Sequence, residues 1–504
     1  MKNGEKHTLK GQVIVEHRIT CPSGGSVTIL KRPDGEEDGI CEHRQRNTME
    51  PIDLNILEMP HGMIHSALKR GEITVCIIGL GHVGLPLALR FAGIGAKVIG
   101  VDIDPSCIEK VKNGRTSLID VALKKTVGPL SLTVDGVEAS GKAQVIFVCV
   151  PTPIDEKHQP DISAVSQASE AVGLGIRKGS IVMIESTVYI GATRNVILPI
   201  LESTSGLRAG KDFGLAYVPE RVDPGNQKHR LDNTPRVIGG IDDKSAEKAA
   251  SILETIINAK IHRASSLEVA EATKLVENVY RDVNIAFVNE LAKYFERIDV
   301  DIIETINLCS SKWSFHPHFP SSGVGGKCIP VSPYYLLHNA DSPELKMVRL
   351  ARRLNESMSE HMVKLVVKGL ERVNKPIEKS KIAILGLTYK PEVADVRGSP
   401  ARPIVEKLKE FCSQVYVHDP LLPIGKRIFG CVNSTFENAV RNADCLVIVH
   451  NHAIFKKIDV TKLKEMMNMP AAVVDGGHLF KPTSVVREGF SYGGVGRGGI
   501  RYGV

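Results

Sequence analysis

A single cysteine in a glycine-rich segment carries the strongest chemical signal of this sequence. Cys328 follows Gly325-Gly-Lys327 and stands two residues before Pro330, far from any cysteine partner. A lone cysteine is commonly a buried structural residue, but these glycines and the proline favour an exposed loop. Because a thiolate is a strong nucleophile, we expect Cys328 to attack an electrophilic carbon and form a covalent intermediate.

A second glycine-rich segment, Gly79-Leu-Gly-His-Val-Gly84, has the spacing of a dinucleotide-binding turn, although such a spacing alone also occurs in ordinary turns. Gly79 permits the tight turn, Gly81 the approach of a pyrophosphate, and Gly84 close packing of helix on strand. Asp102 comes 23 residues after Gly79, where its carboxylate can accept a hydrogen bond from a ribose hydroxyl. Its charge would repel a 2′-phosphate, so we predict NAD rather than NADP as the cofactor.

Two threonines follow later predicted strands. They lie in Val150-Pro-Thr-Pro153 and Glu185-Ser-Thr187. Open α/β sheets bind ligands at the carboxyl ends of their strands, so Thr152 and Thr187 are candidates for contacts with the nicotinamide half of the cofactor. The alternative is that they cap the helices that follow.

Bulk composition describes a globular chain with small-molecule ligands. The 504 residues are 42% apolar and 24% charged, which is enough for two or three domains. The net charge of +7 without a dense Lys/Arg block fits anionic small molecules, and we expect no nucleic-acid partner. The ten cysteines show no CxxC and no zinc spacing, which predicts a reducing cytosol and no metal site. The longest apolar runs are too short to cross a membrane, and the N-terminus does not read as a signal peptide.

The elements that must position these residues form two α/β series and a long helix. Residues 1–70 alternate apolar and polar residues between Pro/Gly turns, which predicts small hairpins or a loosely held arm, and the methionines at 49, 59 and 63 leave the natural start open. Segment 265–298 has no Gly or Pro and opens with the capping box Ser265-Ser-Leu-Glu268, so we expect one long helix. The glycine-rich tail from Tyr492 is expected to be irregular. Strands that alternate with helical patterns are expected at 75–78, 97–101, 145–150 and 181–184, and again at 381–386, 414–419, 445–449 and 472–475.

The predicted fold class is therefore α/β, with two doubly wound Rossmann-like domains joined by a central long-helix domain. The boundaries that we expect are an extension at 1–70, a dinucleotide-binding domain at 71–264, a helical domain with the cysteine loop at 265–372 and a last domain at 373–504. On the long helix, Lys274, Asn278 and Arg281 share one face. Without further information, three polar side chains of this kind are expected to form a solvent-exposed helix face.

The ordered motifs resemble those of the UDP-glucose/GDP-mannose dehydrogenases, and within that family the UDP-N-acetylglucosamine and UDP-N-acetylmannosamine 6-dehydrogenases. The resemblance runs from about Thr74 to the C-terminus. Its Cys-Ile-Pro-Val and Pro-Glu-Arg-Val contexts are closer to the N-acetyl-sugar branch than to the glucose branch. The motifs are Gly79–Pro86, Val150–Pro153, Glu185–Thr187, Tyr217–Val222, Glu271–Asn278, Gly325–Pro330, Gly386–Pro391 and Asp395–Arg397.

The resemblance implies two hydride transfers from C6 of a UDP-sugar to two molecules of NAD+. An aldehyde would be captured by Cys328, oxidised to a thioester and hydrolysed to the uronate. General chemistry agrees, because a thiohemiacetal gives up hydride more readily than a bare aldehyde. The resemblance also implies a cytoplasmic homodimer that serves polysaccharide biosynthesis, with the central domain as dimer interface and the last domain as UDP-sugar-binding domain.

The same resemblance assigns roles to single residues. Lys274 and Asn278 match the pair that assists proton transfer and holds the developing oxyanion, and Glu220 matches a general base or water-positioning residue. The implied cofactor contacts are Gly79, Gly81, His82, Val83, Gly84, Asp102, Thr152, Thr187 and Arg397. Besides Lys274 and Asn278, the implied substrate contacts are Arg221, Val222, Arg281, His316, His318, Gly325 and Lys390. Composition alone leaves both histidines as solvent-exposed loop residues, and Lys390 and Arg397 as surface ion-pair partners.

Several positions depart from the family pattern. Ser332 stands where an acid usually follows the nucleophile, and Lys327, where a histidine is usual, could lower the thiol pKa. The loop from His316 to Cys328 is shorter than usual, Gly398 replaces a common acid, and Gly477-His478 replaces an Arg-containing segment. Three rivals therefore stay open: a UDP-glucose 6-dehydrogenase, a nucleotide-sugar-binding protein without catalysis, and a one-step alcohol dehydrogenase.

Overall fold

The computed structural model divides the chain into two units, residues 1–53 and 54–504. It describes residues 54–114, 129–222, 228–338, 344–412 and 414–497, and the backbone of four strands in the first unit. These strands pair antiparallel in chain order, which confirms the predicted hairpins. They are β1 (Lys6–Leu9), β2 (Gln12–Thr20), β3 (Ser26–Lys31) and β4 (Glu37–Cys41).

The first α/β part of the second unit is built on an eight-stranded sheet of order β12-β11-β10-β9-β8-β5-β6-β7. All neighbours are parallel except the pair β10 and β11. The order reverses between β5 and β8, the topological switch at which such sheets bind ligands. Its strands are β5 (Thr74–Ile78), β6 (Lys97–Val101), β7 (Leu130–Thr133), β8 (Val145–Val148), β9 (Ile181–Ile184), β10 (Gly214–Tyr217), β11 (Arg236–Gly240) and β12 (Ile261–Arg263).

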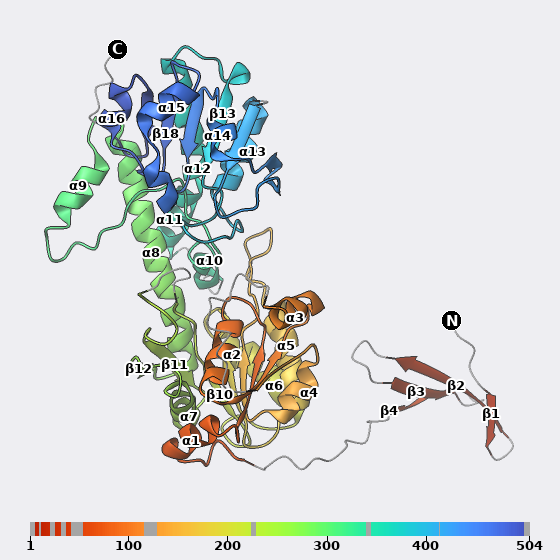
Figure 1. Cartoon of the computed structure of the whole chain (residues 1–504). Helices are drawn as coiled ribbons and strands as arrows, with labels where there is room; N and C mark the ends of the chain where they lie inside the picture. The colour runs from red at the N-terminus through yellow and green to blue at the C-terminus, as the bar shows by residue number, and fades with distance from the viewer. Residues whose placement is uncertain are drawn as a thin grey trace. The chain divides into compact units, whose positions relative to one another are not determined.

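Helices cover this sheet, and an apolar core lies on each face of it (Figure 1). The helices are α1 (His61–Lys69), α2 (Gly84–Gly93), α3 (Pro105–Lys112), α4 (Gly136–Lys142), α5 (Ser163–Gly175), the π-helical turn η2 (Thr193–Ile197), α6 (Leu198–Ser205) and α7 (Asp243–Leu253).

Residues from Leu54 onward belong to this α/β part, whereas the sequence placed the end of the extension near residue 70. Ile56, Ile64 and Leu68 are fully buried in the core. The backbone N–H of Ile56 donates to the carbonyl oxygen of Gly179 at 2.8 Å. Ile64 and Leu68 fix α1 to the domain and Ile56 fixes the segment before it, so the extension ends at about Asp53.

The long helix is α8 (Leu267–Phe295). Its N-cap is Ser266, whose side chain accepts a hydrogen bond from the N–H of Val269 at 3.2 Å. The predicted capping box with Ser265 as N-cap is therefore wrong, because the N-cap lies one residue later. The Glu268 side chain pairs with Arg194 at 2.5 Å. Further helices of the central part are α9 (Ile302–Cys309), α10 (Ser332–Leu337), α11 (Lys346–Glu356) and α12 (Met358–Arg372).

The second α/β part has a five-stranded parallel sheet of order β14-β13-β17-β18-β19. Its elements, with one small antiparallel ribbon, are η3 (Ile377–Lys379), β13 (Lys381–Leu385), α13 (Ala401–Phe411), β14 (Gln414–His418), β15 (Arg427–Ile428), β16 (Cys431–Val432), α14 (Phe436–Val440), β17 (Cys445–Ile448), η4 (Ala453–Lys457), α15 (Val460–Met466), β18 (Ala472–Asp475), α16 (Pro482–Arg487) and β19 (Ser491–Gly494). The two doubly wound parts and the intervening helices confirm the predicted fold class.

Strand β19 corrects the expectation of an irregular tail. It pairs parallel to β18, with Tyr492 opposite Val473. The Tyr492 side chain is fully buried, and its hydroxyl lies 3.3 Å from Oδ2 of Asp475. Burial of one aromatic ring outweighs the low strand preference of the glycines beside it.

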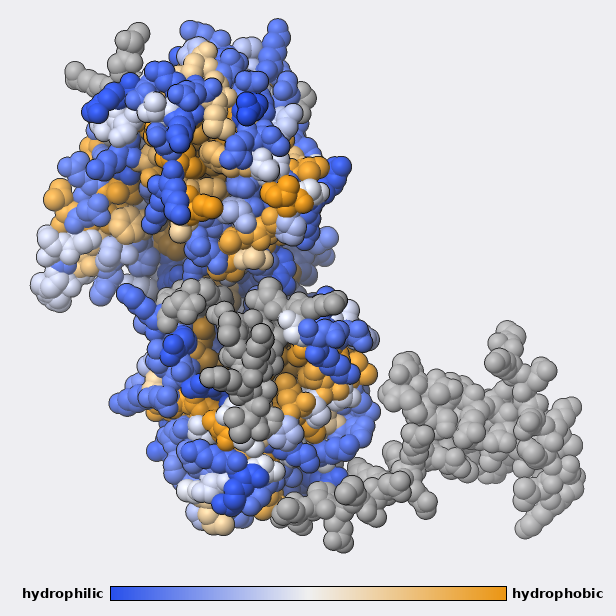
Figure 2. All heavy atoms as spheres, viewed as in Figure 1, coloured by the Kyte–Doolittle hydropathy of each residue, from blue (hydrophilic) through white to orange (hydrophobic). Residues whose placement is uncertain are grey.

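The visible surface of residues 54–497 is mostly hydrophilic, with apolar side chains in smaller groups (Figure 2). Within the described parts of the chain, no helix combines the length and the apolar character that a membrane span requires.

Candidate active site

The turn between β5 and α2 has the geometry that a bound pyrophosphate requires. Gly79 has a φ of 92°, and a Cβ there would lie 2.7 Å from the carbonyl oxygen of Cys149. A Cβ on Gly84 would overlap the carbonyl oxygen of Gly79. In contrast, a Cβ on Gly81 would meet no atom within 4 Å. Two glycines are therefore needed by the fold, while Gly81 leaves open backbone at the start of α2, which fits a dinucleotide phosphate.

Asp102 lies beside this turn, at the end of β6. Its Oδ2 accepts from the N–H of Leu80 at 3.0 Å, and its Oδ1 from the N–H of Asp104 at 3.0 Å. The carboxylate is thus held next to the glycine turn, where a ribose would follow the pyrophosphate. His82 is exposed and Val83 half-buried on the same turn, so the chain's own residues fit an NAD site.

Thr152 and Thr187 lie at the carboxyl ends of β8 and β9, and both are half-buried. Neither is the N-cap of the next helix, because α5 begins after Ile162 and η2 after Ala192. The capping alternative is therefore wrong. The Thr152 side chain instead contacts the hydroxyl of Tyr335, a residue of α10.

A buried ionic cluster surrounds Arg236, the first residue of β11. Its guanidinium lies 3.2 Å from Oε1 of Glu185 and 2.6 Å from Oε2 of Glu220. The thiol of Cys149 donates to Oε2 of Glu185 at 3.3 Å. Burial raises the pKa of Glu185 to about 7, against the attraction of Arg236. Sequence reasoning missed this cluster, and its one visible signal was an arginine at the head of an apolar strand.

Glu220 and Lys274, two residues that the family resemblance implies for the site, are brought together. The ammonium of Lys274 makes a short hydrogen bond to the backbone carbonyl of Glu220. Oε1 of Glu220 accepts from the N–H groups of Arg221 and Val222, each at 2.6 Å. The Glu220 side chain keeps 13% exposure, so one carboxylate stays within reach of a ligand beside α8.

The cysteine loop meets the same face of α8. Nδ2 of Asn278 donates to Oγ of Ser332 at 2.9 Å, and Oγ of Ser332 donates to the carbonyl oxygen of Cys328 at 2.8 Å. The Cys328 side chain is exposed. Asn278 is buried and Lys274 half-buried, so this face of α8 is not simply solvated; Arg281 is exposed.

Arg221 is turned toward α8. It binds both carboxylate oxygens of Glu277, at 3.1 and 2.5 Å, and the carbonyl oxygen of Pro235 at 2.8 Å. The structure therefore places Arg221 next to the site as a bridge between the Glu220 loop and the long helix.

Arg397 joins the second α/β part to the glycine turn. Its guanidinium binds Asp395 at 2.6 Å and lies 2.8 Å from Nε2 of His82. Burial and the charge of Arg397 lower the pKa of His82, and the same two causes lower the pKa of Lys327. Arg397 thus lies close to both His82 and Lys327, and Lys327 directly precedes Cys328 in the chain.

One of the departures from the family pattern has a steric reason. Gly398 has a φ of 64°, and a Cβ there would lie 2.8 Å from the carbonyl oxygen of Gly326. Gly325 is equally crowded, since its Cβ would lie 2.8 Å from the carbonyl oxygen of Tyr389. At the other departure, His478 packs against the loop that follows His316, with Nε2 2.9 Å from the carbonyl oxygen of Pro320.

The two histidines of that loop differ in environment. His316 is exposed, whereas His318 is half-buried, with its ring edge-on to that of Tyr280 and the two centroids 5.9 Å apart. Nδ1 of His318 lies 3.1 Å from the carbonyl oxygen of His316.

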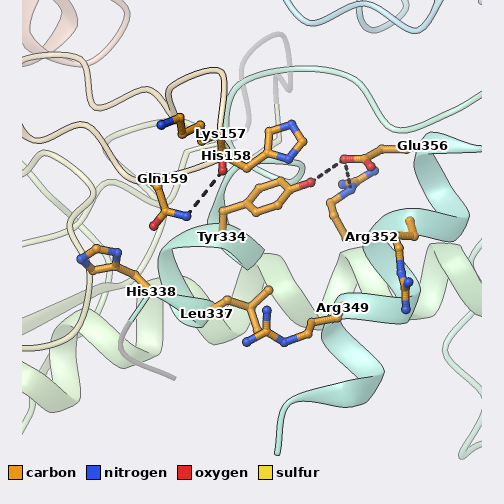
Figure 3. A pocket seen from close by; sticks show the side chains of 10 residues that line it. Lys157, His158, Gln159, Tyr334, Leu337, His338, Arg349, Arg352 and Glu356 are labelled. Carbon is orange, nitrogen blue, oxygen red and sulfur yellow. Dashed lines mark hydrogen bonds and ion pairs between the residues drawn. The ribbon is translucent and has the colours of Figure 1, made fainter. Parts of the chain in front are cut away.

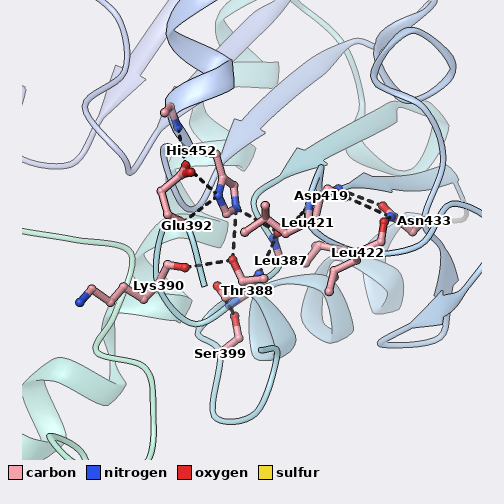
Figure 4. Close-up of polar contacts among 12 residues, drawn as sticks. Leu387, Thr388, Lys390, Glu392, Ser399, Asp419, Leu421, Leu422, Asn433 and His452 are labelled. Carbon is pink, nitrogen blue, oxygen red and sulfur yellow. Dashed lines mark hydrogen bonds and ion pairs between the residues drawn. The ribbon is translucent and has the colours of Figure 1, made fainter. Parts of the chain in front are cut away.

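A second acid and glycine turn lies at the carboxyl ends of β13 and β14, where Asp419 directly follows β14. Oδ2 of Asp419 accepts from the N–H groups of Leu387 and Thr388 at 2.7 and 3.0 Å, and Nε2 of His452 lies 3.1 Å away. In Figure 4 the Lys390 side chain points away from this network, while its carbonyl oxygen accepts from the Thr388 hydroxyl. The network was not predicted, and it repeats the relation of Asp102 to its own turn.

Comparison with known proteins agrees with this geometry. Residues 73–257, 268–357 and 383–482 match the NAD binding, central and UDP binding domains of the UDP-glucose/GDP-mannose dehydrogenase family. The chain belongs to this dehydrogenase family. It is accordingly an NAD-dependent oxidoreductase of the nucleotide-sugar class.

Individual relatives of this dehydrogenase cover most of its length. The UDP-N-acetyl-D-glucosamine 6-dehydrogenase of Pseudomonas aeruginosa is 41% identical over 69% of this chain and 83% of its own. The UDP-N-acetyl-D-mannosamine dehydrogenase of Pyrococcus horikoshii is 34% identical over 84% of this chain and 100% of its own. A solved structure of UDP-D-ManNAc dehydrogenase from Pyrococcus horikoshii superposes with a TM-score of 0.78 at 33% identity, covering 85% of this chain and 100% of that one.

Proposed function

We propose that this dehydrogenase oxidises the C6 hydroxyl of a UDP-N-acetylhexosamine, UDP-ManNAc or UDP-GlcNAc, to the uronate, with Cys328 as covalent nucleophile. The observation that carries the proposal is the convergence of an exposed Cys328 loop, the Lys274–Asn278 face of α8 and Glu220. Ser332 ties this loop to Asn278 at 2.9 Å. These elements come from three separate segments of the chain, so their convergence is a property of the fold.

NAD+, bound at the glycine turn, would supply the hydride acceptor for each of the two oxidations in this scheme. The first oxidation removes the C6 hydride and the hydroxyl proton, and it leaves an aldehyde. The Cys328 sulfur then forms a bond to the aldehyde carbon and its proton passes to the oxygen, which gives a thiohemiacetal. Loss of the second hydride and a proton gives a thioester, and water releases the acid and restores the thiol.

The surrounding residues have roles that their positions support. The ammonium of Lys274 and the amide of Asn278 are donors on one helix face, suited to an oxygen that gains negative charge. Glu220 is the carboxylate next to Lys274 and is suited to accept a proton or orient water. We assign substrate contacts to Arg221, Val222, Arg281, His316, His318, Gly325 and Lys390, and cofactor contacts to the glycine turn, Asp102, Thr152, Thr187 and Arg397.

The choice of sugar rests on the relatives. Those at 41% and 34% identity carry names with an N-acetyl sugar. Incubation of the purified chain with UDP-ManNAc, UDP-GlcNAc and UDP-glucose, followed by NADH and product mass, tests the assignment. We expect two NADH for each N-acetyl uronate and no free aldehyde. Turnover of UDP-glucose alone would contradict it, and one NADH with accumulating aldehyde would favour a one-step alcohol dehydrogenase.

A second candidate is a nucleotide-sugar-binding protein without catalysis. It is favoured by Ser332, which is buried beside the cysteine loop and cannot supply the charge of a carboxylate. Calorimetric binding of NAD+ and a UDP-sugar without NADH release would support it. Cys328→Ser should stop acid formation and keep binding, and an unchanged yield of uronate from this variant would remove the covalent intermediate from the scheme.

We also propose a homodimer with α8 at its interface. One face of α8 carries five apolar side chains that are between 45% and 55% exposed in the single chain. Their spacings of seven, four, seven and seven residues keep them in one stripe. The residues of this α8 stripe are Val269, Val276, Tyr280, Phe287 and Tyr294. We retain a cytoplasmic location as well, with which the free thiols of the eight described cysteines agree.

A further inference from the structure

The short helix α10 follows the cysteine loop and is bonded to it at its first residue. Ser332 accepts from the side chain of Asn278 at 2.9 Å and donates to the carbonyl oxygen of Cys328 at 2.8 Å. Tyr335 lies three residues later, so the two side chains are neighbours on one face of the helix. Whatever Tyr335 contacts is therefore joined to the cysteine loop by a single turn of helix.

Tyr335 contacts the loop between β8 and α5, which carries Thr152. Tyr335 is 1% exposed, and its hydroxyl donates to the carbonyl oxygen of Pro153 at 3.1 Å, with the carbonyl oxygen of Asp161 3.4 Å away. The Thr152 side chain is a further hydrogen-bond partner of this hydroxyl. Burial raises the pKa of Tyr335 to about 12, so the hydroxyl keeps its proton at neutral pH.

These contacts lie at the neck of the loop, where its two arms meet. The N–H of Asp161 donates to the carbonyl oxygen of Pro153 at 2.9 Å, and Ile154 pairs with Pro160 in an antiparallel bridge. Because the arms are tied to each other, a bond at the neck sets the position of the whole segment. Thr152 directly precedes this neck and moves with it.

The second loop that we assign to the nicotinamide also contacts α10. It follows β9 and carries Thr187, and two residues later the ring of Tyr189 packs against that of His338, with centroids 4.4 Å apart. His338 is the C-cap of α10. The same short helix thus contacts both threonine loops and the cysteine loop.

We propose that Tyr335 is a positioning residue for hydride transfer, which fixes the Thr152 loop, and with it the nicotinamide, relative to the sulfur of Cys328. The inference rests on the proposed function, in which the second hydride leaves a carbon that is bonded to this sulfur. Reacting atoms must approach closely, and a misplacement of about 1 Å can cost about a hundredfold in rate. Sulfur and cofactor are held by separate segments of the chain, and Tyr335 links these segments directly.

The neighbouring Tyr334 provides a matched control. Its hydroxyl donates to Oε1 of Glu356 on α11 at 2.7 Å, and its ring packs against that of His158 with centroids 4.5 Å apart (Figure 3). Tyr334→Phe removes one hydroxyl from the same helix and keeps the ring contact. Tyr335→Phe makes the same chemical change at the neck of the loop, where the carbonyl oxygen of Pro153 retains its internal bond, so both variants should fold.

Steady-state release of NADH by the full chain, with a UDP-N-acetylhexosamine as substrate, tests the proposal. Tyr335→Phe is expected to lower kcat at least about tenfold and to change both KM values less than about twofold, because it affects the geometry of the reaction more than binding. A slowed second oxidation lets the thiohemiacetal revert, so aldehyde should appear, trapped with hydroxylamine and identified by mass. Tyr334→Phe should keep kcat and release no aldehyde. Equal kcat values in the two variants, or a loss of kcat without aldehyde, would overturn the proposal.

Hydrogen exchange followed by mass spectrometry gives a readout that does not depend on turnover. With NAD+ bound, the amides of residues 153–161 should exchange faster in Tyr335→Phe than in Tyr334→Phe, because the neck has lost its bond to α10. Unchanged exchange in this segment would refute the link between α10 and the loop.

A double-mutant cycle with Thr152→Val tests the route of the effect. If Tyr335 acts through the Thr152 loop, the combined loss of kcat should be smaller than the product of the two single losses. Independent, multiplicative losses would refute this route. Failure of the proposed function is distinct, because it appears without Tyr335→Phe, as one NADH per sugar in the unaltered chain or as acid formed by Cys328→Ser.

Discussion

Asn278 gives its side-chain N–H to the hydroxyl of Ser332 at 2.9 Å, although the two residues are 54 positions apart in the chain. Ser332 passes the contact on to the carbonyl oxygen of Cys328. The position at which the family usually has an acid is thus used here to fasten the nucleophile loop to α8. A neutral hydroxyl can do this in a buried place where a carboxylate would cost desolvation energy.

Ser332→Ala is expected to lower both stability and turnover. Loss of the hydroxyl leaves a buried amide donor without its acceptor, which costs about 1–3 kcal/mol of unfolding free energy. The looser loop should reduce kcat more than it raises KM. Urea unfolding measures the loss of stability, and NADH release measures kcat and KM. Ser203→Ala is the control, because this hydroxyl is exposed and binds only a carbonyl of its own helix. If Ser332→Ala and Ser203→Ala lowered stability and kcat equally, Ser332 would not be the residue that fastens the cysteine loop to α8.

Much of this arrangement follows from sequence patterns. The eight strands that were predicted agree with the structure to within two residues, because apolar runs between helical patterns are local signals. Strands β7 and β10 to β12 of the first sheet were not predicted. The glycine turn and Asp102 also followed from the residues, whereas the family resemblance paired Lys274 with Asn278 and did not predict the contact of Lys274 with Glu220.

The rest depended on contacts between distant segments. Arg236 begins β11 and Glu185 follows β9, 51 residues away, and no local pattern connects them. The strand at Tyr492 is decided by burial of its ring against β18, not by the glycines around it. Likewise, α1 has an ordinary amphipathic sequence, and only the finished sheet shows what its apolar face covers.

The second and third glycines of the NAD turn, Gly81 and Gly84, should respond differently to substitution by alanine. A Cβ on Gly84 collides with the backbone of Gly79, so Gly84→Ala should destabilise the domain and lower its Tm. Gly81 faces open space, so Gly81→Ala should leave Tm nearly unchanged and weaken NAD+ binding about tenfold or more. Thermal unfolding and calorimetric titration with NAD+ check both. Unaltered NAD+ affinity in Gly81→Ala would argue against a pyrophosphate at this turn.

Glu185 should make stability depend on pH near neutrality. Burial raises its pKa from the ordinary 4.5 to about 7, while Arg236 opposes the shift. Between these values the folded chain holds a proton that the unfolded chain has released, so stability falls as pH rises from about 4.5 to about 7. At about 1.4 kcal/mol for each pKa unit, the loss attributable to Glu185 amounts to about 3 kcal/mol.

Glu185→Gln tests this dependence, because the amide cannot ionise. The unfolding free energies of the unaltered chain and of the variant are measured by urea titration at pH 5, 6 and 7.5. As the pH rises, the unaltered chain should lose stability relative to the variant. Glu220, Cys149 and Lys274 also face this carboxyl, and they are present in both proteins, so their own titration largely cancels. A difference that is constant with pH would show that Glu185 is ionised throughout.

The α8 stripe predicts how the chain associates. Val269, Val276, Tyr280, Phe287 and Tyr294 are about half exposed on the single chain, and pairing of two such helices would bury them. Phe287→Glu places a charge in the middle of the stripe, and desolvation of that charge should disfavour association. Light scattering after gel filtration should give twice the chain mass for the unaltered protein and a single chain mass for the variant. Leu174→Glu is the matched control, since Leu174 is 53% exposed on α5, outside the stripe. If the dimer persisted in Phe287→Glu and was lost in Leu174→Glu, the interface would lie on the first α/β part and not on α8.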